Sequence, residues 1–405
     1  MKEYLWTIYK YEIGKVIRRK LFWITALLCL AAVIVTVCAG LYAVYYVEGE
    51  PLVSQYEAFR RDQSERKSLS GRKIDEALLQ ETVDAYGRIP SDTAKYALTE
   101  EYEHYARPYR DIFFLIRNWT GMDLPAVQQW QVDASGLYAA RKQLLEEQWQ
   151  YMELRESEKE FWRAKEQQLE MPLTYQYHDG YEAMMKDFLT IGVLMLFFAA
   201  ICLPNLFADE HARKTDQLVL SSAKGKNPAY WAKILAGITV SLAAAMTLSL
   251  VTAGLCLGIY GTEGFAMPLQ AYCSTGTYSY PITIGQACMI SYGILIVTSV
   301  LAAVFVMVIS EFLRSSVAAL ALATGMIILG NMVTIPSHYR VAAQLWDWLP
   351  VTYLSLWNVF DARILPLFGR CLVSWQAVPV IYILCSILLA IGGKYIYRRY
   401  QVSGR

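Results

Sequence analysis

The sequence contains several long apolar runs that are almost free of charged residues. These runs cover residues 21–46, 188–206, 234–260, 282–310, 317–335 and 377–397. Each run is long enough to cross the roughly 30 Å hydrocarbon core of a bilayer as an α-helix, which rises about 1.5 Å per residue. Because backbone polar groups inside a bilayer must be paired within the chain, these runs predict a helical membrane protein with six spans.

The segment 47–187, between the first two runs, has a different composition. From Glu48 to Asp187 it holds 27 acidic and 18 basic residues, a net charge of −9, whereas the whole chain has a net charge of +1. Residues 55–86 and 126–170 show long helical patterns with few Gly and Pro residues, and no apolar run interrupts them. We therefore expect an acidic helical domain inserted between two spans of a basic membrane protein.

The basic residues of the shorter loops predict the orientation of the spans. The predicted inner segments hold 16 Lys and Arg residues, and the two shorter outer loops hold three. Short loops rich in Lys and Arg stay in the cytoplasm, which predicts cytoplasmic termini and an extracellular domain at 47–187. Residues 1–20 predict an interfacial amphipathic helix, because a stripe recurs at helical intervals among basic residues: Tyr4, Leu5, Ile8, Tyr9, Glu12 and Val16.

Residues 207–233 form a polar, mostly basic segment between the second and third spans, and we expect it to be cytoplasmic. Its middle part, Thr215–Ser222, alternates short apolar and polar residues, which favours one or two helical turns along the membrane surface. Such a helix would suit contact with a soluble partner. A solvated connector explains the same residues equally well.

This segment resembles the first cytoplasmic loop of type-2 ABC exporter permeases. The resemblance rests on a Phe-x-x-Glu, a Thr, a Leu-x-Leu-Ser-Ser element and a Lys before a span, here Phe207, Glu210, Thr215, Leu218, Leu220, Ser221 and Lys233. Two positions depart from the pattern, since Lys214 stands where Gly is common and Ala223 where Pro often follows. In that family the loop holds the coupling helix that docks on the ATPase. The resemblance thus implies a coupling role for Asp209, Glu210, Lys214, Thr215, Gln217, Leu218, Leu220, Ser221 and Ser222.

Other parts of the chain support this resemblance. The helix at 1–20 is similar to the family's elbow helix, and Leu345–Phe360 within 336–375 is similar to the re-entrant gate segment before the last span. The implied fold is an all-α polytopic membrane protein with six transmembrane helices, an N-terminal amphipathic elbow helix, and a helical extracellular domain between the first two spans. Because the family uses twelve spans, the resemblance implies a homodimer with two separate ATPase subunits.

Catalytic motifs are missing from the sequence. It has no GxxxxGK[ST] phosphate loop, no HExxH zinc motif and no GxSxG element, and its spans carry almost no ionisable residues. We therefore expect no enzyme activity, metal or cofactor in this chain, with ATP and Mg²⁺ bound by the partner ATPase. The basic residues are spread over loops at one membrane face, so nucleic acid is not an expected partner.

The substrate is predicted only by class. A large helical domain between the first two spans resembles Gram-positive exporters of amphipathic cytolytic toxins and antimicrobial peptides. The candidate translocation path is uncharged and includes Phe197, Phe198, Asn205, Met326 and Asn331. It suits an amphipathic peptide or a lipid-like molecule, so a drug or lipid exporter is an alternative, as is a membrane sensor or scaffold. The acidic domain could gather cationic peptides, or its charge could only keep it soluble.

Three local features complete the expectations. Pro204-Asn205 predicts a kink near the inner end of the second span. Gly254 and Gly258 form a GxxxG pattern that allows close helix approach, although a lone pattern is weak evidence. Cys273 and Cys371 are the only cysteines placed outside the membrane, where they would form a disulfide or remain as two free thiols.

Overall fold

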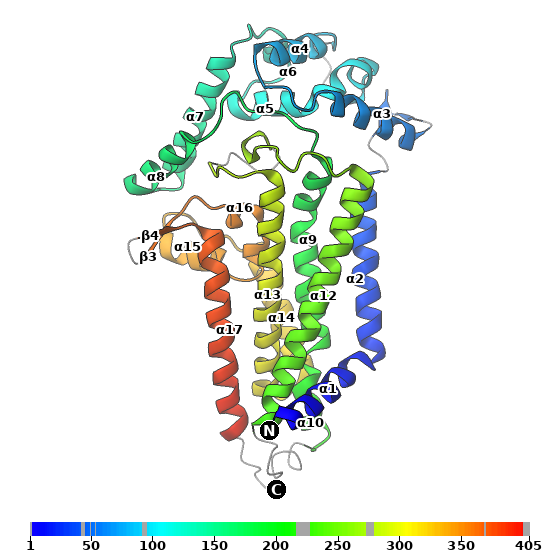
Figure 1. The fold of residues 1–405 in the computed structure, drawn as a ribbon, viewed down its shortest axis with the longest axis vertical. Helices are drawn as coiled ribbons and strands as arrows, with labels where there is room; N and C mark the ends of the chain where they lie inside the picture. The colour runs from blue at the N-terminus through cyan, green and yellow to red at the C-terminus, as the bar shows by residue number, and fades with distance from the viewer. Residues whose placement is uncertain are drawn as a thin grey trace.

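The fold is a long bundle of apolar helices with a second group of helices over one end (Figure 1). The computed structural model describes residues 2–41, 45–48, 50–52, 54–90, 95–215, 227–272, 279–367 and 370–399. Helix α1 (Lys2–Ile17) and the end of α17 (Ser374–Arg399) lie at the end of the bundle farthest from the second group.

Five helical segments among the described residues are long and apolar enough to cross a membrane. They are Lys20–Ala39 (α2), Asp179–Ala212 (α9 and α10), Pro228–Tyr260 (α12), Ile284–Leu313 (α13) and Ser374–Arg398 (within α17). The predicted span at 317–335 corresponds to α14 (Ser316–Met332), an apolar helix of 17 residues that extends about 25 Å. Val333 after it is extended, and Pro336 cannot continue a helix.

The second predicted span differs from the observed helix at both ends. Helix α9 (Asp179–Cys202) begins well before the apolar run at 188, and its first turn carries the acidic residues Asp179 and Glu182, which suit a helix N-terminus. The helix then stops before Pro204, and α10 (Asn205–Ala212) continues the chain. The break confirms the predicted kink at this proline.

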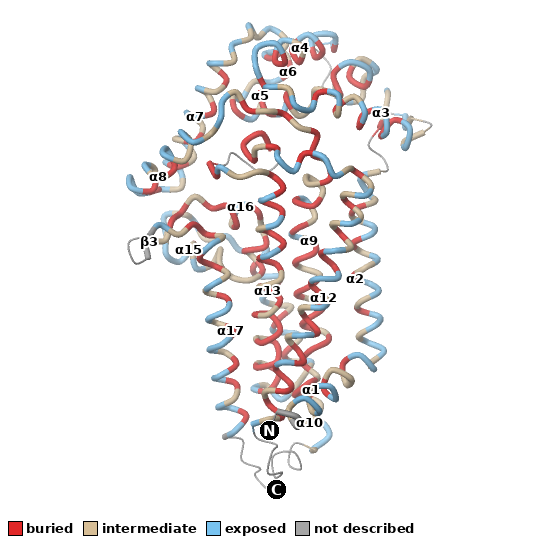
Figure 2. Tube along the Cα trace, in the orientation of Figure 1, coloured by how far each residue is buried: buried red, intermediate tan, exposed pale blue. Residues whose placement is uncertain are grey.

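Helices α9 and α13 form the centre of the bundle, where the trace is mostly buried (Figure 2). Helix α13 packs against α9, α12, α14 and α17, while α2 packs against α9 and α12, and α1 crosses α12. The outward faces of α2 and α17 expose large apolar side chains such as Leu28 and Leu388. An exposed apolar face of this kind is compatible with a bilayer as the surrounding solvent.

Close contact between α12 and α13 occurs at Gly237. A Cβ atom there would lie 2.3 Å from Sδ of Met307, so any side chain would displace the methionine. A Cβ atom placed on Gly254 or Gly258 of the GxxxG pattern would have no neighbouring atom of the described residues within 4 Å. Within one chain, the close approach is thus made at a different glycine.

The acidic segment folds into short elements rather than two long helices. They are β1 (Tyr46–Val47), β2 (Glu50–Pro51), α3 (Gln55–Ser68), α4 (Glu76–Tyr86), η1 (Tyr96–Leu98), η2 (Tyr102–Ala106), η3 (Arg107–Tyr109), α5 (Arg110–Thr120), α6 (Leu124–Gln128), α7 (Ala134–Tyr151) and α8 (Glu156–Glu166). The expected helix at 55–86 is broken because Gly71 adopts a φ of 87° and Asp75 caps α4 by accepting from the Leu78 amide. The expected helix at 126–170 is broken near Glu153, whose φ is 51°.

The remaining short elements lie near the same end of the bundle as the acidic domain (Figure 1). They are η4 (Leu269–Ala271), α15 (Arg340–Asp347), η5 (Thr352–Leu354), α16 (Leu356–Val359), β3 (Leu365–Leu367) and β4 (Arg370–Leu372). The β1–β2 and β3–β4 pairs are antiparallel two-stranded ribbons. We refer to residues 340–372 as the outer segment.

Candidate functional site

The buried ammonium group of Lys233 is the centre of the candidate site at the α10 end of the bundle. Lys233 lies in the second turn of α12 and has no exposed surface. Its Nζ atom donates to Oε1 of Glu210 at 2.7 Å and to the Leu206 carbonyl at 2.6 Å, and lies 5.4 Å from the ring centroid of Phe207. A buried ammonium ion needs such partners to offset its lost hydration. Phe207, Glu210 and Lys233, three positions of the sequence motif, therefore meet in space.

Helix α1 adds two further charges to this site. The Lys15 ammonium lies 2.9 Å from Oε1 of Glu12 and 3.5 Å from Oε1 of Glu210, and Glu12 lies 3.6 Å from Lys233. Burial alone would lower the pKa of Lys15, but the two carboxylates outweigh it and raise this pKa above its usual value. We call Glu12, Lys15, Glu210 and Lys233 the Lys233 cluster. It joins α1, α10 and α12 through alternating charges.

A second set of polar contacts fastens α10 to its other neighbours. Arg19, between α1 and α2, forms an ion pair with Asp209. When the side-chain amide of Asn205 is oriented to suit its neighbours, its nitrogen donates to Asp209 and to Ser316 of α14, both at 3.3 Å, and its oxygen accepts from Arg19 at 2.9 Å. His211 contacts Glu311 of α13 at 2.9 Å. Helix α10 thus has polar contacts to α1, α12, α13 and α14.

The chain leaves α10 through Lys214, one of the two positions that depart from the sequence pattern. The Lys214 amide donates to the His211 carbonyl at 3.2 Å, and the Thr215 amide donates to the Glu210 carbonyl at 3.0 Å. These two bonds form a Schellman motif, in which the residue after the helix adopts a left-handed conformation and is usually Gly. Lys214 has a φ of 54°. A lysine therefore occupies the left-handed position of this motif, where glycine is usual.

The predicted coupling residues are only partly described. Four of them lie in α10 or directly after it and make the contacts described above: Asp209, Glu210, Lys214 and Thr215. The other five, Gln217, Leu218, Leu220, Ser221 and Ser222, lie outside the described residues. Sequence reasoning missed Glu12 as a member of the cluster. The sequence did indicate an unusual role for this residue, because Glu12 is an acidic residue within the otherwise apolar stripe of the first helix.

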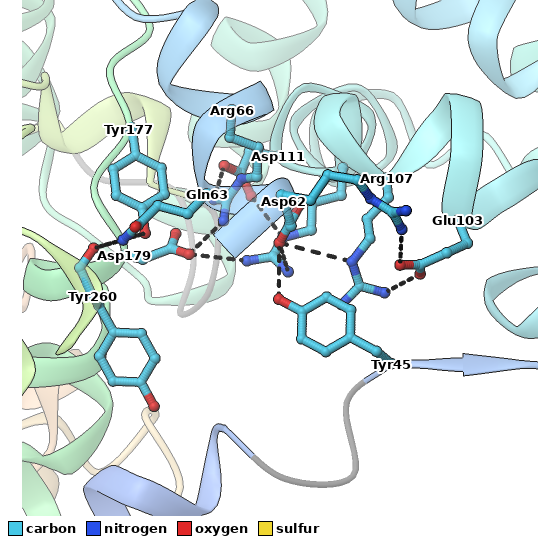
Figure 3. A network of polar contacts seen from close by, with 12 residues as sticks. Tyr45, Asp62, Gln63, Arg66, Glu103, Arg107, Asp111, Tyr177, Asp179 and Tyr260 are labelled. Carbon is cyan, nitrogen blue, oxygen red and sulfur yellow. Dashed lines mark hydrogen bonds and ion pairs between the residues drawn. The ribbon is translucent and has the colours of Figure 1, made fainter. Parts of the chain in front are cut away.

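At the opposite end of the bundle, a buried polar network joins the acidic domain to the long helices (Figure 3). The Arg66 guanidinium of α3 pairs with Asp111 of α5 and with Asp179, the first residue of α9. Gln63 and Tyr177 both donate to the Tyr260 carbonyl at the end of α12, at 2.9 and 2.7 Å. We call these six residues the Arg66 network.

The Arg66 network contains a carboxyl group with a strongly perturbed pKa. Burial would raise the pKa of Asp111, but the neighbouring Arg66 and Arg110 outweigh it and lower this pKa well below its usual range. Tyr175 also donates to the Asp111 carboxylate at 2.8 Å. Asp111 is thus held as an anion, and it fixes the position of Arg66.

The acidic domain makes a separate contact with the outer segment. Trp162 of α8 donates its indole N–H to the Ala362 carbonyl at 2.7 Å, and its ring lies 4.6 Å from that of Tyr280. Glu158, which is buried, accepts from Arg340 at 2.5 Å and from the Ile364 amide at 2.9 Å. The domain is therefore attached to the bundle at two places, through α3 and through α8.

Comparison with known protein families decides the class of this molecule. The profile described as "ABC-2 family transporter protein" matches residues 6–401, which is nearly the whole chain. The chain belongs to the ABC-2 transporter family. A comparison with curated proteins gives no match.

Membership of the ABC-2 family identifies the chain as a multi-pass permease subunit of the plasma membrane and implies an ABC ATPase as its partner. The sequence contains no GxxxxGK[ST] phosphate-binding loop, which agrees with ATP binding by a separate subunit. Among the described residues, no three His, Cys, Asp or Glu side chains are gathered in a way that could hold a metal ion.

The candidate path residues of this ABC-2 chain do not converge within the single chain. Met326 of α14 lines an apolar groove of about 830 Å³ between α13, α14 and α17. Phe198 faces the other side of the bundle, where its ring packs 5.6 Å from that of Phe22, and Asn205 belongs to the α10 contacts. Asn331 is exposed, and Phe197 is half-buried. A path formed with a second copy stays a prediction.

The predicted disulfide also stays a prediction. Cys371 is exposed on β4 of the outer segment, whereas Cys273 lies outside the described residues. The distance between the two Cα atoms, which decides whether a bridge can form, is therefore not described.

Proposed function

We propose that this permease is one half of an ATP-driven exporter, in which two copies of the chain pair with each other and with two ATPase subunits. The family match and the missing phosphate loop support the separate ATPase. In this proposal α14 completes the sixth span, α1 is the elbow helix at the cytoplasmic surface, and both termini are cytoplasmic. The excess of Lys and Arg at the α10 end supports this orientation.

Coupling to the ATPase would pass through α10 and the segment that follows it. The observation that carries this proposal is the Lys233 cluster, in which α1, α10 and α12 share buried ion pairs. Separating buried ion pairs is strongly unfavourable, so the three helices would move together when the ATPase displaces the loop. Because α10 directly continues α9, the same displacement would tilt α9 and change the path between the two copies.

We further propose that the substrates are amphipathic peptides, such as cytolytic toxins or antimicrobial peptides, and that the host is a Gram-positive bacterium. The net charge of −9 between Glu48 and Asp187 supports a cationic substrate, since an extracellular acidic domain would attract it. The alternative is a drug or lipid exporter. The apolar groove of about 830 Å³ favours that alternative, because its walls are almost entirely apolar.

Purification of the permease from membranes of its own host tests the proposal. We expect a P-loop ATPase to copurify in an equal amount, with a complex mass that fits two copies of each chain. The ATPase activity of this complex in lipid nanodiscs should rise on addition of a cationic amphipathic peptide. Stimulation by a neutral lipid analogue in place of the peptide would favour the alternative. Purification without any ATPase would contradict the exporter and favour a sensor or scaffold.

A further inference from the structure

A small polar cavity lies where the acidic domain meets the long helices. It is next to the Arg66 network that Figure 3 shows. It has a volume of about 260 Å³ and is bounded by α2, α3, α9 and the end of α12. Phe59 of α3 and Tyr260 of α12 form an aromatic wall, with ring centroids 5.7 Å apart in an edge-to-face arrangement. The Tyr260 hydroxyl donates to the Val37 carbonyl at 2.7 Å, which holds this ring in place.

Acidic side chains outnumber basic ones in the lining of this cavity. The charged lining residues are Asp62, Asp179, Glu182, Asp187, Arg110 and Lys186. Lys186 is paired with Glu182 at 2.5 Å, and Arg110 lies 3.6 Å from Asp62 and 3.4 Å from Asp179. Two arginines outside the lining also pair with these carboxylates, Arg107 with Asp62 at 3.7 Å and Arg66 with Asp179. Asp187 has no ion-pair partner among the described residues. Asp187 therefore supplies the negative charge of the lining that no ion pair among the described residues offsets.

The carboxylates of Asp62 and Asp179 have unused hydrogen-bonding capacity. Asp62 is only 4% exposed, and its Oδ1 atom has no hydrogen-bond partner among the described residues. The Oδ1 atom of Asp179 also has no hydrogen-bond partner among the described residues. A buried carboxylate oxygen without a donor is unfavourable, so a ligand that brings N–H donors and positive charge would be stabilised here.

We propose that this cavity binds an organic cation, namely an alkylammonium or guanidinium group. The excess carboxylates would supply the charge and the acceptors, and the aromatic wall of Phe59 and Tyr260 would favour a cation over a neutral amide. A lysine or arginine side chain of a peptide and a free small amine share this chemistry. The proposal does not depend on the substrate of the transporter, because it rests on the cavity alone.

Binding of N-acetyl-lysine amide to the full-length permease in nanodiscs tests the proposal, with the Nε-acetylated, neutral form of the same compound as the matched ligand. We expect isothermal titration to give an affinity for the charged compound at least about tenfold higher than for the neutral one, and to show weaker binding at high salt. Equal binding of the two compounds, or no binding of either, would overturn the proposal.

The matched variants are Asp187→Asn in the cavity and Glu160→Gln, which neutralises an exposed carboxylate of α8. Asp187→Asn should lower the affinity about tenfold, while the melting temperature stays the same or rises because an unpaired carboxylate has been removed. Glu160→Gln should change neither quantity. Unchanged affinity in Asp187→Asn would overturn the proposal even if the wild-type protein binds the ligand.

A competition experiment distinguishes the two sources of the cation. If a cationic amphipathic peptide displaces N-acetyl-lysine amide from the wild-type protein, the cavity accepts a peptide side chain. If the peptide does not displace it while spermidine does, the cavity accepts a free amine. Displacement that persists in Asp187→Asn with the wild-type affinity would place the binding elsewhere and contradict the assignment of this cavity.

Discussion

At the scale of single residues, the Lys233 cluster is the best-defined feature of the α10 end. Its two carboxylates and two ammonium groups come from three helices, of which α1 is distant in the sequence from α10 and α12. Glu210 has a structural role there, in addition to its position in the proposed coupling loop. A variant such as Glu210→Ala would therefore change folding and coupling together, and other variants are needed to separate the two.

A double-mutant cycle tests the cluster. Lys233→Met leaves Glu12 and Glu210 with one ammonium group, so the free energy of unfolding should fall by about 3–5 kcal/mol. Adding Glu210→Gln leaves one carboxylate, Glu12, opposite one ammonium group, Lys15. The double variant should therefore be about 1–3 kcal/mol more stable than expected from adding the effects of the two single variants. Thermal unfolding in detergent measures these effects, with the exposed Lys10→Met as the control. Strictly additive losses would contradict a shared ion-pair cluster.

Lys214→Gly tests the Schellman motif after α10. Lys214 has a φ of 54°, and a non-glycine residue in this region is strained by about 1–2 kcal/mol. Gly removes this strain but makes the unfolded chain more flexible, so we expect a net stabilisation of at most about 1 kcal/mol. Lys214→Ala keeps the strain and should give no gain. A lower melting temperature for Lys214→Gly than for Lys214→Ala would contradict this explanation.

The residues of the motif could be predicted from the sequence, but their partners could not. Phe207, Glu210 and Lys233 are among the positions that predicted a coupling loop, because they are close in the sequence and have a recognisable spacing. The coupling role itself stays a prediction. Glu12 lies on a different helix, and its place in the cluster depends on how α1 crosses α12. Amphipathic periodicity predicts that a helix has an apolar face, but not which neighbour that face meets.

At the scale of elements, apolar length predicted the long helices well and their ends less well. Helix α9 begins at Asp179 because polar residues of the acidic domain continue the helix beyond the apolar run. The expected long helices of that domain are broken by Gly71 and near Glu153, where the backbone adopts positive φ values. Helical periodicity continues across such breaks, so the sequence pattern overestimated their length.

The attachment of α3 and α5 to α9 should depend on pH. The Asp111 pKa is lowered in the folded state. This carboxylate therefore stabilises the fold fully at pH values above its unfolded pKa of about 3.9. The stabilisation is lost as the pH falls from there through the folded pKa. Asp111→Asn removes this contribution. The stability difference between wild type and Asp111→Asn should therefore be constant from about pH 5 to 7 and shrink below about pH 4. A difference that grows on acidification would contradict the depressed pKa.

At the scale of the whole molecule, the acidic domain is attached to the bundle through the Arg66 network and through α8. Both attachments lie far from the Lys233 cluster, at the opposite end of the long helices (Figure 1). Among the described residues of one chain, the long helices connect the two ends. This separation predicts that the domain and the ATPase contact can be altered independently.

Replacement of residues 48–178 by a short Gly/Ser linker tests that independence. We expect the variant to assemble with the ATPase and to keep basal hydrolysis, because the α10 contacts are unchanged. Export efficiency or substrate range should change, since the outer segment loses its contacts with Trp162 and Glu158. A helical bundle that no longer assembles with the ATPase would refute a modular domain. Unchanged export of every cationic peptide would refute its role in transport.

ATP-driven peptide transport tests the central claim most directly. The permease and its copurifying ATPase are reconstituted in liposomes, and uptake of a labelled cationic amphipathic peptide is measured with ATP and with ADP, for the wild type and for Leu218→Asp in the proposed coupling segment. The account predicts uptake by the wild type with ATP only, and hydrolysis without uptake in Leu218→Asp. Uptake that does not require ATP, or that Leu218→Asp leaves at the wild-type rate, would contradict it.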